Sequence, residues 1–113
     1  MVRRAVPRPR RAMPDAYQVT LTEGALADLD RLDTFLREKN PAAANRMLAA
    51  ITTALGHLAT SPFTGHQLPA SPLRAKLVRF GKGGYVCLYE VRGQMVLVAR
   101  VFHGREDRGS GAG

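Results

Sequence analysis

Three apolar segments follow one another in the second half of the chain, and only short glycine-containing connections separate them. Each segment is rich in valine, leucine or aromatic residues, and they run from Leu73 to Phe80, Tyr85 to Val91 and Met95 to Phe102. The connections, Gly81 to Gly84 and Arg92 to Gln94, have the composition of turns. This arrangement predicts three consecutive strands that form an antiparallel meander.

Two helical segments precede these strands. Thr22 can cap the first helix with its side-chain oxygen, and Glu23 adds negative charge at the positive end of the helix dipole. We expect this helix to reach about Lys39 and to bury a face with helical spacing. The predicted apolar face is Leu26, Leu29, Leu32, Phe35 and Leu36, and the predicted polar face is Asp28, Asp30, Arg31, Asp33 and Arg37.

The pair Asn40-Pro41 breaks this helix and suits the start of a second one, which ends at Ser61-Pro62. So short a connection predicts two antiparallel helices that pack as a hairpin. The predicted apolar face of the second helix is Ala44, Met47, Leu48, Ile51, Ala54, Leu55 and Leu58.

A first strand is predicted around Tyr17, Val19 and Leu21, which alternate with polar residues. The stretch from Phe63 to Pro72 has no period and is predicted to be a loop. The order strand, helix, helix and three strands predicts an α+β two-layer sandwich, with the helical hairpin on one face of a four-stranded sheet.

The positive charge is concentrated at the start of the chain. The net charge is +8, and five arginines precede the first acidic residue, Asp15, leaving +3 for the rest. With its proline content and no hydrophobic period, segment 1–15 is predicted to be a disordered basic arm. We expect one folded domain over residues 16–108 and a flexible tail over 109–113.

The remaining composition argues against several kinds of site. The single cysteine, Cys87, lies in an apolar strand and is expected to be a core residue in a reducing cytoplasm. His57, His66 and His103 have no ligand-spaced partners, so we expect no metal and no cofactor. No apolar stretch approaches the ~20 residues that span a membrane.

Cationic residues surround the predicted meander, and they are the candidates for contact with a macromolecule. The set comprises Arg74, Lys76, Arg79, Lys82, Arg100, His103, Arg105 and Arg108. Arg100 lies in an otherwise apolar strand, so it must face solvent or be paired. A solvated sheet face without a specific role is the alternative interpretation.

The order of several short motifs resembles the ParE/RelE toxin superfamily over residues 16–108. These motifs are Tyr17 to Thr22, Ala25-x-x-Asp28-Leu29, Ser61 to Gly65, Leu73-Arg74, Tyr85-x-x-x-Tyr89-x-Val91 and Arg100 to Asp107. The ending Arg-Val-Phe-His-Gly-Arg resembles the ParE branch in particular.

The resemblance implies a toxin of a type II toxin–antitoxin system. ParE-like members bind DNA gyrase and trap its cleaved-DNA complex, and a cognate antitoxin silences them in a hetero-oligomer. On this hypothesis the target-binding residues are Arg74, Arg79, Arg100, His103, Arg105 and Arg108.

RelE-like members instead cleave messenger RNA in the ribosome, which requires acid–base and phosphate-stabilising groups. In the corresponding strand this chain has Gly84-Tyr85-Val86, so the arginine that the resemblance implies is missing. The alternative nuclease site is His103 with Arg105 and Arg79. A degenerate toxin that only binds its antitoxin is a third possibility.

Overall fold

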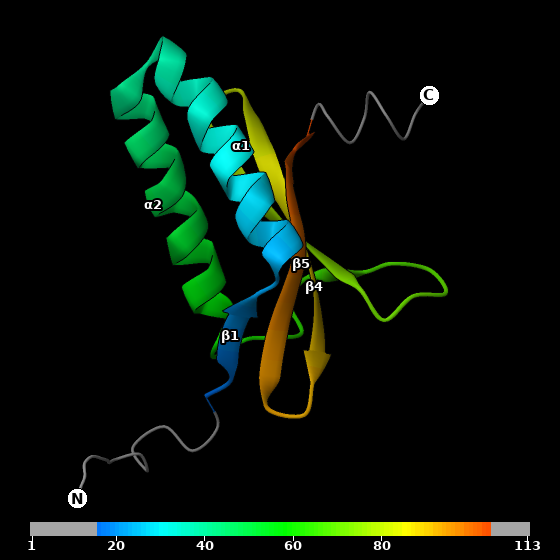
Figure 1. Cartoon of the computed structure of the whole chain (residues 1–113). Helices are drawn as coiled ribbons and strands as arrows, with labels where there is room; N and C mark the ends of the chain where they lie inside the picture. Colours follow the sequence, from blue (N-terminus) through cyan, green and yellow to red (C-terminus); the bar gives the residue numbers. More distant parts are fainter. Residues whose placement is uncertain (1–15, 105–113) are drawn as a thin grey trace, which may run out of the picture.

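The computed structural model describes residues 16–104, which form two helices packed on one face of a mixed five-stranded sheet (Figure 1). The elements are β1 (Gln18–Leu21), α1 (Glu23–Lys39), α2 (Pro41–Leu58), β2 (His66–Gln67), β3 (Arg74–Phe80), β4 (Gly83–Arg92) and β5 (Met95–His103). The predicted α+β class and helical hairpin are confirmed. The predicted arm and tail lie outside the described residues.

The sheet has the strand order β1-β5-β4-β3-β2. Antiparallel pairing joins β3 to β4 and β4 to β5, which confirms the meander. β1 runs parallel to β5 and forms one edge, with Gln18 opposite Met95. The expectation of a four-stranded sheet with an irregular loop was wrong in one respect, because His66–Gln67 adds a fifth strand that is too short to show a period.

Asn40 both ends α1 and begins α2. Its backbone N–H donates to the carbonyl oxygen of Leu36, and its side-chain oxygen accepts from Ala43 N–H at 3.0 Å. Pro41 then occupies the first position of α2, where a missing N–H costs nothing. The predicted break at Asn40-Pro41 is therefore confirmed.

The buried face of α1 is rotated from the predicted one. Leu26 and Phe35, both expected in the core, are 55% and 61% exposed, whereas Asp28, expected on the polar face, is only 5% exposed. Ala25 and Leu32 are the apolar residues buried beside it. The rotation follows from a polar contact of Asp28 with β5, which hydrophobic spacing does not register.

The core lies between the helical hairpin and the sheet. Met47 and Ile51 of α2 belong to the same buried cluster as Tyr89 and Val98 of the sheet, and all four are almost fully buried. Cys87 is also fully buried, as predicted, and burial raises the pKa of its thiol to about 11. Neither helix of the described chain is long and apolar enough to cross a membrane.

Candidate target-binding surface

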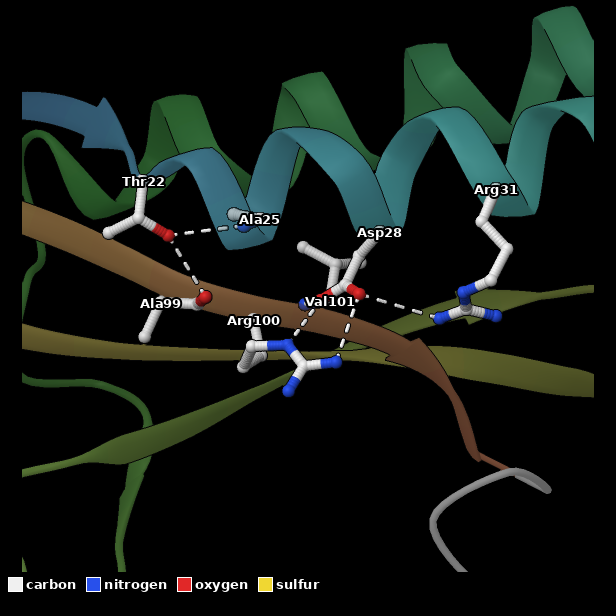
Figure 2. Close-up of polar contacts among 7 residues, drawn as sticks. All are labelled: Thr22, Ala25, Asp28, Arg31, Ala99, Arg100 and Val101. Atoms are coloured by element: carbon white, nitrogen blue, oxygen red, sulfur yellow. Dashed lines mark hydrogen bonds and ion pairs between the residues drawn. The ribbon is translucent and has the colours of Figure 1, made fainter.

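The end of β1 leaves the neighbouring edge of β5 without a strand partner, and α1 covers that edge with two polar side chains (Figure 2). Thr22 accepts from Ala25 N–H at the start of α1 and donates to the carbonyl oxygen of Ala99 at 3.0 Å. One turn later, Asp28 accepts from the buried N–H of Val101 at 2.9 Å. These side chains satisfy the backbone groups that a further strand would bind.

Arg100 completes this contact with Asp28. Its Nε and Nη2 donate to the two carboxylate oxygens of Asp28 at 2.7 and 3.0 Å, and Arg31 lies 3.6 Å from the same carboxylate. Burial by itself would raise the pKa of the Asp28 carboxyl. The hydrogen bonds from Arg100 and Val101 and the charges of Arg100 and Arg31 outweigh burial, so the pKa of this carboxyl lies below its ordinary value. Asp28 is therefore an ionised anchor between α1 and β5.

Arg74 holds the loop that follows α2. Its guanidinium donates to the carbonyl oxygens of Phe63 and Gly65 at 3.2 and 3.0 Å and lies over the Phe63 ring. The Arg74 side chain therefore stabilises the loop. Because these contacts occupy its guanidinium, the side chain is less able to reach toward a target.

The buried side chain of Tyr89 holds the same loop through two hydrogen bonds. Its buried hydroxyl donates to the carbonyl oxygen of Pro62 at 2.7 Å and accepts from Gly65 N–H at 2.9 Å. A Cβ at Gly65 would lie 2.5 Å from the Tyr89 hydroxyl oxygen, so only glycine fits there. The Ser61 to Gly65 and Tyr85 to Val91 motifs are thus parts of one contact.

Arg79 and His103 lie near the same hairpin end but on opposite faces of the sheet. Arg79 is opposite Gly84, whereas His103 is opposite Tyr85, the next residue of β4, and successive residues of a strand point to opposite faces. The His103 ring packs edge-on against the Tyr85 ring at 5.1 Å between centroids. Arg79 instead lines an open hollow of about 600 Å³ that also involves Lys82.

The helix-free face of the sheet is apolar at its centre. Val86 of β4 has Leu77 of β3 and Phe102 of β5 as its lateral neighbours, and Leu77 is 71% exposed. Val86 therefore stands where the RelE resemblance implies an arginine, and its two neighbours offer no charged substitute.

The structure disperses the predicted target-binding residues that it describes. Arg74 and Arg100 make contacts within the fold, while Arg79 and His103 lie on different faces. Arg105 and Arg108 fall outside residues 16–104. Among those residues, no three His, Cys, Asp or Glu side chains lie close enough to hold a metal ion.

Sequence reasoning missed the role of Asp28, although the residue belongs to a motif that carries the resemblance. The signal that could have found it is its spacing. Asp28 lies three residues after Ala25 and four before Leu32, so it shares a helix face with these two residues, which are both buried. It also missed Arg46 and His57 of α2, which line a groove beside β3.

Comparison with known proteins identifies the family. Residues 19–108 match the family described as ParE toxin of the type II toxin–antitoxin system parDE. Toxin RelE1 and Toxin RelE3 of Caulobacter vibrioides are each 33% identical to this chain, covering 81% and 80% of it and 98% and 97% of their own lengths.

Solved structures share the fold. One from the chromosomal ParDE system of P. aeruginosa has a TM-score of 0.65 at 16% identity, covering 79% of this chain and 97% of its own. One from the toxin–antitoxin complex RelBE2 of Mycobacterium tuberculosis has a TM-score of 0.50 at 22% identity, with coverages of 78% and 98%. The fold, the motifs and the family match agree: the chain belongs to the ParE toxin family of type II toxin–antitoxin systems, within the ParE/RelE superfamily.

Proposed function

We propose that this toxin acts by binding DNA gyrase and trapping its cleaved-DNA complex. The observation that supports this proposal is the dispersal of the nuclease candidates. General acid–base cleavage requires its groups to reach one phosphate at the same time. Arg79 and His103 lie on opposite faces of the sheet, and Val86 occupies the central position of the helix-free face. Such a surface suits inhibition by binding better than catalysis.

The proposed contact surface with gyrase lies at the hairpin end of the sheet. Arg79 is exposed, and no hydrogen bond or ion pair involves its side chain within residues 16–104. Its charge is therefore available to a target. His103 lies at the border of this surface, and Arg105 and Arg108, which lie outside the described residues, are proposed as further contacts with the target.

We further propose that a cognate antitoxin neutralises the toxin in a hetero-oligomer. The family is defined by toxin–antitoxin pairs, and the two similar solved structures come from systems with that description. A flexible, acidic antitoxin segment that folds on the toxin would cover its basic surface and keep gyrase away.

The experiment is a supercoiling assay with purified gyrase, beside a translation extract that contains a reporter messenger. We expect the toxin to inhibit supercoiling and to leave the messenger intact. The Arg79→Ala variant should weaken inhibition without loss of fold, whereas Arg92→Ala, at the other end of β4, should not weaken it. Normal supercoiling at every toxin concentration would contradict the proposal.

A ribosome-dependent messenger endoribonuclease is the second candidate, because the two curated relatives carry RelE names. Its proposed groups are His103 as acid or base and Arg79 and Arg105 as phosphate clamps. The same translation extract tests it: messenger cut at codon-spaced positions, and cleavage lost in His103→Ala, would favour this function over gyrase inhibition.

A further inference from the structure

β3 has an edge that is only partly paired. β2 is opposite Arg74 and Ala75 alone, so within residues 16–104 β3 continues from Lys76 to Phe80 without a neighbouring strand on its outer side. The N–H of Leu68 donates to the carbonyl oxygen of Leu73, so the backbone groups of Leu73 and of every second residue after it point outward, including those of Leu77 and Arg79. In the described chain, no backbone hydrogen bond from outside β4 reaches these groups. Such an edge is a template for another strand.

A groove of about 640 Å³ runs between this edge and α2. Its α2 side consists largely of small residues, which let another backbone approach closely: Ala49, Ala50, Thr53 and Ala54. Four residues that carry or can carry positive charge complete the lining: Arg46, His57, Lys76 and Arg79. No acidic residue lines the groove, and these four side chains make no ion pair or hydrogen bond with residues 16–104.

We infer that this groove binds an extended acidic peptide, which adds a strand to the outer edge of β3. The alternating N–H and C=O groups of Leu77 and Arg79 match a peptide backbone and have no counterpart in a nucleic-acid strand. Arg46, His57 and Lys76 on the α2 side of this edge, and Arg79 on its helix-free side, favour carboxylates on the added strand. The inference rests on the proposed function only for the origin of the peptide, which would be the antitoxin; occupation of the groove would then cover Arg79.

The direct test uses the purified chain and a fluorescent peptide in which glutamate alternates with valine. We expect saturable binding in fluorescence polarisation, with an affinity that falls as salt is added. The same peptide with alternate backbone nitrogens methylated keeps its charge but cannot pair with a strand edge, so it should bind at least about tenfold more weakly. Equal binding of both peptides, or tighter binding of oligothymidylate, would overturn the inference.

A charge-reversal variant tests the position of the site. Arg46→Glu/Lys76→Glu should weaken peptide binding by about tenfold or more, because both reversed side chains line the groove. The control, Lys39→Glu/Arg92→Glu, changes the net charge equally at residues outside the groove and should bind nearly as the unchanged chain does. Circular dichroism of both variants verifies the fold, and equal weakening by both would show that no groove site exists.

Failure of this inference can be told apart from failure of the proposed function. Arg46→Glu/Lys76→Glu leaves Arg79 intact and should still inhibit gyrase supercoiling. Inhibition without peptide binding by the unchanged chain would refute the groove alone, whereas peptide binding without inhibition would refute the gyrase proposal alone.

Discussion

Removing the Asp28 carboxylate tests the contact that joins α1 to β5. In Asp28→Ala, the N–H of Val101, a fully buried residue, loses its only acceptor among residues 16–104. An unsatisfied buried donor costs about 1–3 kcal/mol. Arg100 also loses its partner, but its side chain is more than half exposed, so water replaces much of that interaction. The expected loss therefore comes mainly from Val101.

Urea unfolding and thermal melting measure this effect. A loss of about 1–3 kcal/mol corresponds to a melting temperature lowered by roughly 5–15 °C in a domain of this size. Asp28→Asn retains an oxygen for Val101 and should lose less. Asp33→Ala is the matched control, because it removes a partly exposed ion pair with Arg37 on the same helix and leaves no buried N–H without an acceptor. If Asp28→Ala and Asp33→Ala had equal stability, the proposed role of Asp28 would be wrong.

Three further predictions concern buried groups. Tyr89→Phe removes the hydroxyl that bonds both Pro62 and Gly65, and it should lower the free energy of unfolding in urea by about 1–3 kcal/mol. The lowered pKa of Asp28 stabilises the fold above about pH 4, and this stability is lost as pH falls through the folded-state pKa. Urea unfolding at several pH values should therefore show the difference between the unchanged chain and Asp28→Asn shrinking in acid. Cys87, with its pKa raised to about 11, should resist a thiol reagent at pH 8 until urea unfolds the chain.

The sequence predicts much of this fold because its signals are local. Asn40-Pro41 breaks the helices, and the turns at Gly81 and Gly93 separate the meander strands; each signal acts within a few residues. The parallel pairing of β1 with β5 is not local. It joins segments more than seventy residues apart, and no short pattern specifies it.

The candidate site is harder to predict for the same reason. The sequence leaves open whether Arg100 faces solvent or is paired, and it does not reveal the contacts of Arg74, yet each side chain is engaged within the fold. The partner of Arg100, Asp28, lies 72 residues away, and helical spacing alone assigns Asp28 to the polar face. A charge pattern shows which groups are available, whereas only the packing of α1 on β5 shows which of them are already paired.

The proposed action on gyrase requires that the toxin stabilise a cleavage complex, and this complex can be detected directly. Purified toxin is incubated with gyrase and supercoiled plasmid, and detergent and protease then release any DNA ends that gyrase holds. We predict linear plasmid in proportion to the toxin, and less of it with Arg79→Ala than with Arg92→Ala. Plasmid that stays intact with active gyrase, together with messenger cleavage in a translation extract, would contradict the gyrase proposal and favour the endoribonuclease.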